Sequence, residues 1–360
     1  MITIIYPYRE RDLDRIRFSL NSLNLQTDKN FNVKFVDYGS SIEHSKLIKE
    51  TIKTYSFVDY KYYYTQYQPW NKSKALNSVI KNLETSHFFV ADIDMIFHPE
   101  FIANVNQLSK TNDVWYYQVG FLDKSTSKVE KSFSEYTVKF KSNKEATGLT
   151  LCPTEYAKNI RGFDEIYHFW GSEDTDFHER LKNKGYDVKF YSEKLLLLHK
   201  WHKTYRNKEK KYLTKKLQVN GIVQFNKNQL DFAKVNKRVI VNDVNWGRIM
   251  SHEEFVDLQK ADNYIEYNNY LSTINHFLYQ QLTNIKPGTY HFKFKLIDNK
   301  DYLKYLYNLI FKRKKKMPKL LSLKAVNDKL LFHIINFYHN KNYCFKVSDD
   351  KTFIFLSIKI

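Results

Sequence analysis

Residues 88–97, FFVADIDMIF, place two carboxylates inside an otherwise apolar run. An ionised carboxylate that is buried without a partner strongly destabilises a folded protein. In an extended segment, residues two apart point to the same side, so Asp92 and Asp94 are expected to lie side by side and to repel each other. The run therefore predicts a buried strand over 88–91, whose two following carboxylates either reach water or meet a cation.

The first third of the chain alternates between strand-like and helix-like patterns. Apolar side chains at helical spacing are typical of amphipathic helices, and short apolar runs are typical of buried strands. Alternating strands and helices form mostly parallel sheets with helices on both faces, so we expect an α/β fold. The predicted strands are 2–6, 33–36, 60–66 and 88–91, and the predicted helices are about 13–23, 42–54 and 71–83.

Polar clusters follow three of these predicted strands, at residues 8–11, 37–40 and 92–94. In open parallel sheets, ligands bind beyond the carboxyl ends of the strands. We therefore expect the three clusters to meet at one edge of the sheet and to form a ligand site there.

A second block of patterns runs from residue 147 to residue 202. It predicts strands at 147–153 and 188–191 and a helix at about 173–183 that ends near Gly185. Near residue 235 the pattern changes to short mixed elements. We therefore predict one domain over 1–235 and a smaller α+β domain of unassigned role over 236–360. The remaining predicted elements are helices at 212–233, about 253–284 and about 300–315, and strands at 290–297 and 352–360.

Two metal-ligand patterns are open to two interpretations each. A divalent cation such as Mg²⁺ or Mn²⁺ would remove the repulsion between Asp92 and Asp94 and would keep coordination positions for phosphate oxygens. The alternative is a surface turn with two solvated aspartates. His199 and His202, in the sequence HKWH, could complete such a carboxylate site, or they could be ordinary histidines in a basic loop.

An acidic cluster, WGSEDTD, occupies residues 170–176. Acidic side chains in the first turn of a helix are favoured by the helix dipole. This effect alone accounts for the presence of one or two of these acidic residues. An aromatic plane such as Trp170 beside a carboxylate is also typical of a sugar-binding site. A carboxylate placed there could accept the proton of a sugar hydroxyl as a general base.

Composition limits the class of protein. Of the 360 residues, 42% are hydrophobic and 17% aromatic, which favours a folded chain over a disordered one. The net charge of +19 makes an anionic partner plausible without choosing one. Cys152 and Cys344 form no disulfide framework, and we expect no signal peptide and no membrane span. These features favour a cytoplasmic setting.

Six segments, taken in their order along the chain, resemble the nucleotide-sugar glycosyltransferases of the GT-A fold, specifically family 2. The later segments resemble the galactosyltransferase-type motif. The resemblance covers about residues 1–230 and implies a GT-A (Rossmann-like) sheet. The segments are IIYPYRERDLDRI (4–16), FVDYGS (35–40), WNKSKALN (70–77), FVADIDMIF (89–97), RGFDE with WGSEDTDFHERLKNKGYDV (161–188) and LLLHKWH (196–202).

The resemblance implies a Mn²⁺- or Mg²⁺-dependent enzyme of bacterial-type surface polysaccharide synthesis, such as capsule or lipopolysaccharide. It would move a hexose or N-acetylhexosamine from a UDP-sugar to a saccharide or lipid-linked saccharide, with inversion. The implied catalytic residues are Asp174, as general base, and Glu173. The implied metal ligands are Asp94 and His199, with His202 as the alternative to His199. The implied acceptor contacts are Trp170, Gly171 and Glu173. The implied contacts to the donor nucleotide are Pro7, Tyr8, Arg9, Arg11, Asp37, Lys74, Asn77 and Asp92.

The sequence departs from the family pattern at two positions. Tyr38 stands where the family often has a second aspartate, which puts the ribose contacts in question. Arg161 replaces the first glycine of the usual GGFDE, and it would either contact an anionic acceptor or remain solvated; we favour solvation.

Three further alternatives remain open. The net charge and the aromatic content also suit a nucleic-acid-binding protein, although that class gives no reason for the order of the acidic and histidine motifs. A non-catalytic glycan-binding protein on a transferase fold is another. Residues 300–319 combine an apolar helix face with the basic run FKRKKKMPK. That segment would either contact the inner face of the cell membrane or pack as a core helix whose cations complement its dipole.

Overall fold

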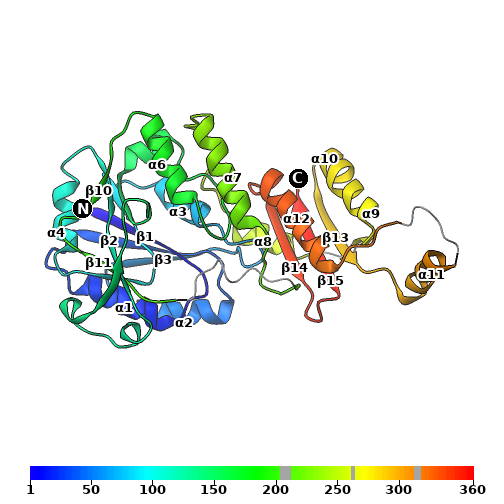
Figure 1. The fold of residues 1–360 in the computed structure, drawn as a ribbon, viewed down its shortest axis with the longest axis horizontal. Coiled ribbons are helices and arrows are strands. Elements are labelled where there is room, and N and C mark those ends of the chain that lie inside the picture. Colours follow the sequence, from blue (N-terminus) through cyan, green and yellow to red (C-terminus); the bar gives the residue numbers. More distant parts are fainter. Residues whose placement is uncertain (203–211, 261–263, 312–317) are drawn as a thin grey trace. The chain divides into compact units, whose positions relative to one another are not determined.

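The computed structural model describes the chain except for residues 203–211, 261–263 and 312–317 (Figure 1). The chain divides into two compact units. Within the described residues, no helix has both the length and the apolar character that crossing a membrane requires. The first unit comprises Met1–Gln66, Trp70–Asn207 and Ile222–Ile249, and the second comprises Tyr67–Pro69, Lys208–Gly221 and Met250–Ile360.

A seven-stranded sheet forms the centre of the first unit, in the order β10-β6-β9-β4-β1-β2-β3. All neighbouring pairs are parallel except those of β9, which runs antiparallel to β4 and to β6. The predicted α/β class with a mostly parallel sheet is therefore confirmed. The strands are β1 (Ile2–Tyr8), β2 (Phe31–Asp37), β3 (Val58–Tyr62), β4 (His87–Val90), β6 (Val114–Tyr117), β9 (Thr150–Pro153) and β10 (Val188–Tyr191).

Helices cover both faces of this sheet (Figure 1). Successive side chains of a strand point to opposite faces, and β1 shows the result: Ile4 and Tyr6 belong to one buried cluster and Ile5 to another. The first cluster includes residues of α1, α2 and α4, and the second includes residues of α3, α5 and α6. The helices are α1 (Leu13–Asn24), α2 (Ile42–Ile52), α3 (Lys72–Ile80), α4 (Phe101–Leu108), α5 (Thr154–Asn159), α6 (Glu173–Asn183) and α7 (Ile222–Val235).

A smaller sheet of the first unit joins segments that lie far apart in the sequence. Its order is β5-β11-β7-β8, with β5 (Met95–Phe97), β11 (Leu197–His199), β7 (Val119–Leu122) and β8 (Val138–Lys141). Strand β11 pairs antiparallel with β5 so that His199 lies opposite Met95. The amide of Lys200 donates to the carbonyl of Asp94 over 2.9 Å. This pairing brings the histidine motif beside the D-x-D motif.

The second unit contains a four-stranded sheet in the order β12-β13-β15-β14. Helix α12 buries Val326, Leu330 and Ile334. The strands are β12 (Ile265–Asn268), β13 (Thr289–Lys295), β14 (Asn342–Val347) and β15 (Phe353–Lys359), and the helices are α8 (His252–Asp257), α9 (Leu271–His276), a π-helical turn (Phe277–Gln281), α10 (Leu282–Asn284), α11 (Asn299–Ile310) and α12 (Leu323–Phe337).

Two predicted helices differ from the structure. The helix expected at 212–233 begins only at Ile222, because Gly221 has φ +79°, which an α-helix does not accommodate. The helix expected at 253–284 is divided, because residues 265–268 pair with β13 as strand β12. Apolar residues in this stretch therefore belong to a sheet as well as to helices, and their spacing alone did not separate the two.

The first unit also continues beyond the predicted boundary. Residue 235 is the end of α7, whereas the first unit extends to Ile249. The chain after α7 is held to the sheet domain by the buried ring of Trp246 and by a hydrogen bond from Asn183 Nδ2 to the carbonyl of Arg238. The change of pattern near residue 235 therefore marks the end of a helix inside the unit.

Candidate functional site

Asp94, His199 and His202 form a cluster with the donor set of a metal site. Their ligand atoms all lie within 4.8 Å of one another. His199 Nε2 lies 3.5 Å from Asp94 Oδ1, and His202 Nε2 lies 3.2 Å from Asp94 Oδ2. The sequence left open which histidine would join Asp94, and the structure brings both to it.

The electrostatics of Asp94 favour its ionised form. Burial by itself would raise the pKa of this carboxyl group. The attraction of His199 and His202, when these are protonated, and of Arg15 and Arg11 outweighs burial, so that the pKa lies below its ordinary value. The carboxylate is therefore available as a ligand at neutral pH.

The residues present fit a divalent metal ion. Two imidazole nitrogens and one carboxylate oxygen supply three donors, a number that leaves coordination positions for phosphate oxygens or water. A further cation stands close by, since Arg15 Nη1 lies 3.6 Å from Asp94 Oδ2 and is buried without a hydrogen-bond partner among the described residues.

Asp92 and Asp94 do not face each other. Strand β4 ends at Val90, and the chain then turns, with the amide of Met95 donating to the carbonyl of Asp92 over 3.2 Å. Asp92 Oδ1 lies 3.8 Å from Lys72 Nζ, whereas Asp94 faces the two histidines. The expectation of two side-by-side carboxylates in an extended segment is therefore wrong, because the segment is a turn.

Lys72 lies at the centre of three carboxylates. The sequence patterns predicted no role for this lysine. Its Nζ lies 2.9 Å from Asp174 Oδ2, 3.3 Å from Glu173 Oε1 and 3.8 Å from Asp92 Oδ1. Burial lowers the pKa of Lys72, but the three carboxylates outweigh burial and raise it well above its ordinary value. Lys72 is therefore a permanent cation in the site.

The position of Lys72 follows from the start of α3. The side chain of Asn71 accepts from the amide of Lys74 over 2.8 Å and caps the helix, which makes Lys72 its first residue. The motif WNKSKALN contains both Lys72 and Lys74, and the family resemblance directed attention to Lys74. The signal that could have found Lys72 is this N-cap, which places the side chain at the edge of the sheet where α6 also begins.

Asp174 has the environment of a general base. It lies in the first turn of α6, with Glu173 beside it. Burial raises its pKa to about 7, and the charges of Glu173 and Asp92 add to the rise while Lys72 opposes it. A carboxyl group that titrates near neutrality can accept a proton and release it again at physiological pH.

The loop before α6 has a strained backbone. Phe169, Gly171 and Ser172 have φ values of +66°, +100° and +76°. Asn226 of α7 holds the loop by donating to the carbonyls of His168 and Trp170, each over 3.0 Å. Strained residues that surrounding contacts hold in place are frequent at functional sites. The loop carries Trp170, which is 39% exposed and precedes Glu173 and Asp174 by three and four residues in the sequence.

The residues expected along the donor nucleotide occupy two kinds of position. Arg9 lies over the rings of Tyr38 and Trp70, and its Nη2 donates to the carbonyl of Thr65 over 2.6 Å. Arg11 is exposed. Pro7 and Tyr8 in β1 are buried. Asp37 is also buried, and it accepts from the amide of Ser40 and from the hydroxyl of Tyr60, each over 2.9 Å.

Lys74 and Asn77 are also buried, and Asn77 binds the RGFDE segment. Its Nδ2 donates to the carbonyl of Phe163 over 2.8 Å and to Glu165 Oε1 over 2.9 Å. Burial lowers the pKa of Lys74, although Glu165 opposes this. Gly162 lies against the same side chain, since a Cβ added to it would come 2.2 Å from Asn77 Oδ1. These contacts fix α3 to residues 161–165.

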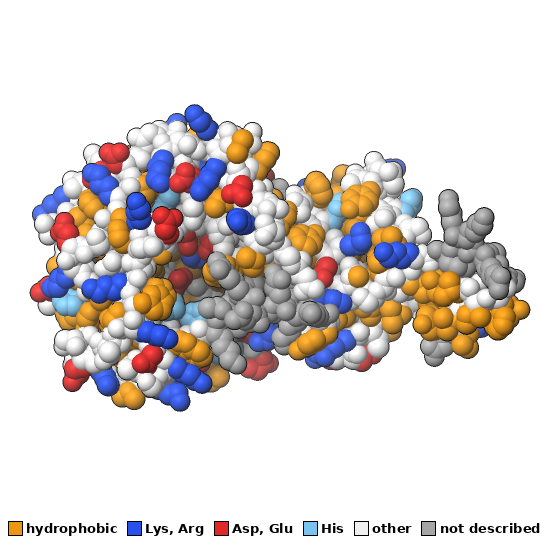
Figure 2. Space-filling view, in the orientation of Figure 1, with side chains coloured by type: hydrophobic (Ala, Val, Ile, Leu, Met, Phe, Trp, Pro, Cys, Tyr) orange, Lys and Arg blue, Asp and Glu red, His pale blue; other side chains and the backbone are white. Residues whose placement is uncertain are grey.

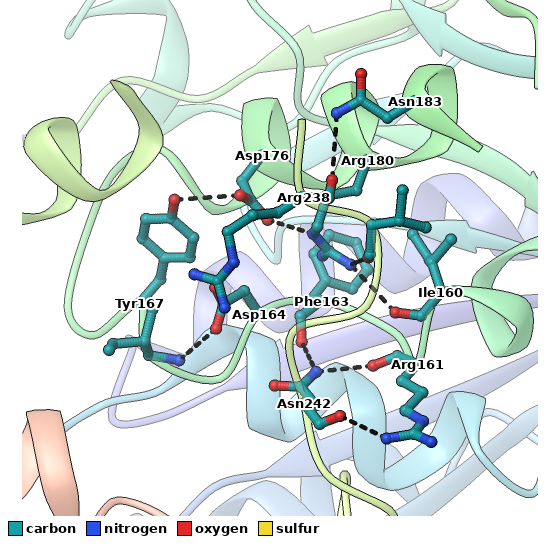
Figure 3. A network of polar contacts seen from close by, with 12 residues as sticks. Ile160, Arg161, Phe163, Asp164, Tyr167, Asp176, Arg180, Asn183, Arg238 and Asn242 are labelled. Atoms are coloured by element: carbon teal, nitrogen blue, oxygen red, sulfur yellow. Dashed lines mark hydrogen bonds and ion pairs between the residues drawn. The ribbon is translucent and has the colours of Figure 1, made fainter. Parts of the chain in front are cut away.

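A buried polar network anchors α6 (Figure 3). Arg180 Nε donates to Asp176 Oδ2 over 2.6 Å, and both side chains are 1% exposed. Tyr167 donates to Asp176 Oδ1 over 3.3 Å. Asp176 therefore holds α6 in place through Arg180 and Tyr167, whereas Glu173 and Asp174 face Lys72.

The same view shows how Arg161 is held (Figure 3). Its Nη1 donates to the carbonyl of Asn242 over 3.0 Å, and Asn242 Nδ2 donates to its carbonyl over 2.7 Å. The expectation of a merely solvated Arg161 is therefore wrong, because the side chain binds the segment after α7.

Comparisons with known proteins give two family matches. Residues 3–163 match the family described as Glycosyl transferase family 2, and residues 127–205 match the family described as N-terminal domain of galactosyltransferase. A comparison with curated protein sequences gives no match. Together the two matches span residues 3–205, and they bear out the resemblance to family 2 glycosyltransferases with a galactosyltransferase-type segment that the sequence predicted.

Similar solved structures include S. aureus TarS, with a TM-score of 0.46 and 14% identity over 79% of this chain and 46% of the TarS chain. A shorter TarS chain, in complex with UDP, gives a TM-score of 0.46 and 13% identity over 97% of this chain and 94% of that one. The mannosyltransferase PcManGT from Pyrobaculum calidifontis, in complex with GDP-Man and Mn²⁺, gives 0.40 and 14% over 55% of this chain and 56% of its own.

Proposed function

We propose that this chain is a metal-dependent, inverting glycosyltransferase that uses a UDP-sugar as donor. The observation that carries the proposal is the turn after β4, whose two carboxylates face different partners. Asp94 faces His199 and His202, whereas Asp92 faces Lys72, which also binds Asp174. This arrangement supports a donor diphosphate held at Asp94 and an acceptor hydroxyl held at Asp174.

The donor set favours Mn²⁺ over Mg²⁺. Carboxylate oxygens suit both ions, whereas imidazole nitrogens suit transition metals. When bound, such an ion neutralises the charge that develops on the departing diphosphate. Asp94, His199 and His202 would hold it, and Asp92 would contact the donor ribose or a water molecule.

The proposed reaction is a single displacement. The acceptor oxygen forms a bond to the anomeric carbon while the bond from that carbon to the diphosphate oxygen breaks, and UDP leaves. The proton of the acceptor hydroxyl passes to the carboxylate of Asp174. Because attack and departure occur on opposite faces of the sugar, an α-linked donor gives a β-linked product.

Lys72 has a positioning role in this scheme. Its ammonium group lowers the pKa of Asp174 and so keeps a larger fraction of the base ionised. It also neutralises Asp92 and Glu173, whose charges would otherwise repel a diphosphate. Trp170, Gly171 and Glu173 would hold the acceptor sugar.

We assign the chain to bacterial-type surface polysaccharide synthesis at the cytoplasmic side of the cell membrane. The donor sugar is a hexose or an N-acetylhexosamine, and the acceptor is a saccharide or a lipid-linked saccharide. Nucleic-acid binding, which the net charge alone would suit, gives no role to three carboxylates around Lys72. A non-catalytic glycan-binding protein gives no reason for a base whose pKa is about 7.

A screen of UDP-sugars tests the proposal. The native chain should hydrolyse one donor slowly, and that donor should raise its melting temperature, in both cases only with Mn²⁺ or Mg²⁺ present. A chain that neither binds nor hydrolyses any UDP-sugar in the presence of these ions would refute the proposal.

A further inference from the structure

Helix α11 of the second unit has an apolar face that nothing in the described chain covers. Tyr302, Leu303, Leu306, Tyr307, Leu309 and Ile310 recur at helical spacing, and Phe311 follows the helix. Leu306 is half-buried, and the exposed fractions of the other named side chains run from 45% for Tyr302 to 68% for Phe311. Figure 2 shows hydrophobic side chains gathered over this helix.

The burial of α11 excludes one of the two roles that its sequence suggests. A helix that packs into a core buries one stripe of side chains, as α12 does with Val326, Leu330 and Ile334. None of residues 300–311 is buried. A helix of this length is marginal in water without tertiary packing. Helix α11 therefore has the composition of a packed helix without a core to pack on.

The charges around α11 indicate the chemistry of its partner. Lys300 and Lys304 lie at the border of the apolar face, next to Tyr307, by their spacing. Five consecutive cations, 312–316, follow Phe311 in the sequence; their placement lies outside the described residues, so only their charge is used. A partner that is both apolar and anionic fits this combination.

We propose that α11 docks this chain on an anionic lipid surface, with its apolar face at the boundary between headgroups and acyl chains. An amphipathic helix binds such a surface through its buried apolar area and through the attraction of its cations to anionic headgroups. A second copy of the chain satisfies the apolar face less well, because it would bring another cationic segment to the same contact.

The proposal names the segment that would hold the enzyme at the membrane, and it partly rests on the proposed function. A lipid-linked acceptor lies at the membrane, so docking would concentrate the enzyme on its substrate. Vesicle binding is measured without sugar transfer, so the failure of docking and the failure of the transferase assignment are distinguishable.

Flotation of the full chain with vesicles tests the proposal. The chain should float with phosphatidylcholine vesicles that contain phosphatidylglycerol, and float much less with phosphatidylcholine alone or in high salt. The variants Leu303→Glu and Ile310→Glu should each weaken binding about tenfold or more, because each removes one large apolar side chain from the contact. The matched control Leu47→Glu changes an exposed leucine on α2 and should bind like the native chain.

Three results would overturn the proposal. In the first, the native chain stays free of anionic vesicles, and in the second, both α11 variants bind these vesicles as tightly as the native chain does. In the third, the native chain is a dimer that does not bind vesicles, and the α11 variants are monomers. That result would mean that the apolar face of α11 binds a second copy of the chain. Since the substituted side chains are exposed, circular dichroism should show the variants folded, and a soluble acceptor should still be glycosylated.

Discussion

The side-chain nitrogen of Lys72 lies 2.9 Å from a carboxylate oxygen of Asp174, and this ion pair joins the first residue of α3 to the first turn of α6. Both side chains are less than one-fifth exposed. Burial raises the pKa of Asp174 to about 7, and Lys72 opposes the rise. The ion pair therefore sets the pH at which the proposed base becomes active.

Removal of Lys72 should move the activity of the enzyme to higher pH. The base works when ionised, so the rate should rise through about pH 7 in the native enzyme. A cation at this distance holds a carboxyl pKa down by about 1–3 pH units, so the acidic limb of the kcat profile should shift upward by about that amount in Lys72→Met. Lys72→Arg should restore the native profile, and Lys81→Met, at the other end of α3, should not change it. An unshifted limb in Lys72→Met would contradict the role assigned to this lysine.

Substitution of the base should separate binding from transfer. Asp174→Asn should keep the affinity for Mn²⁺ and UDP-sugar and should lower kcat by about 10²–10⁴, the range that general-base catalysis contributes. Isothermal titration gives the first quantity and product formation the second. Glu179→Gln, a partly exposed position on the same helix, is the control. Transfer by Asp174→Asn at the native rate would show that the base is another residue.

Both histidines should support the metal. His199→Ala and His202→Ala should each raise the Mn²⁺ concentration needed for half-maximal activity by at least about tenfold. Chelator should abolish activity in the native chain, and added Mn²⁺ should restore it. His276→Ala, which changes an exposed histidine of the second unit, should behave like the native chain. If one of the two site variants keeps the native Mn²⁺ dependence, that histidine is not a ligand.

The buried pair Asp176–Arg180 should matter for stability. Arg180→Ala leaves the carboxylate of Asp176 without its ion-pair partner, so the free energy of unfolding should fall by about 3–5 kcal/mol. The exposed pair Glu179–Lys182 on the same helix gives the control, since Lys182→Ala should change that energy by at most about 1 kcal/mol. Denaturant titration measures both, and equal effects would contradict the account of the network.

Gly162 and Gly185 both have positive φ but differ in their surroundings. A Cβ at Gly185 meets nothing within 4 Å, so Gly185→Ala should lower the free energy of unfolding by about 1–2 kcal/mol, from backbone strain alone. A Cβ at Gly162 would come 2.2 Å from Asn77 Oδ1, so Gly162→Ala should be more destabilising. Chemical denaturation of the two variants gives the comparison. Equal losses would mean that the contact with Asn77 relaxes freely.

Much of the fold could be predicted because its signals are local. Alternating apolar runs located β1, β2 and β4, and the acidic first turn with Gly185 beyond the end located α6 to the residue. The pairing of β11 with β5 could not be predicted in this way. It joins residues about a hundred positions apart in the sequence, and local periodicity does not report such contacts.

The sequence predicted which residues form the candidate site better than it predicted what each of them contacts. Asp94 and the two histidines do come together, although spacing could not choose between the histidines. The turn after β4 was read as extended, so Asp92 was expected beside Asp94 rather than beside Lys72. Lys72 itself was missed because its importance depends on three carboxylates from two distant segments.

The most direct test of the central claim is a titration of Mn²⁺ in the presence of UDP, followed by the electron paramagnetic resonance signal of the free ion. The account predicts that the native chain binds one Mn²⁺ together with UDP, that Asp94→Ala loses this binding, and that Asp59→Ala, an exposed aspartate of β3, keeps it. Binding of Mn²⁺ and UDP by Asp94→Ala at the native affinity would contradict the account.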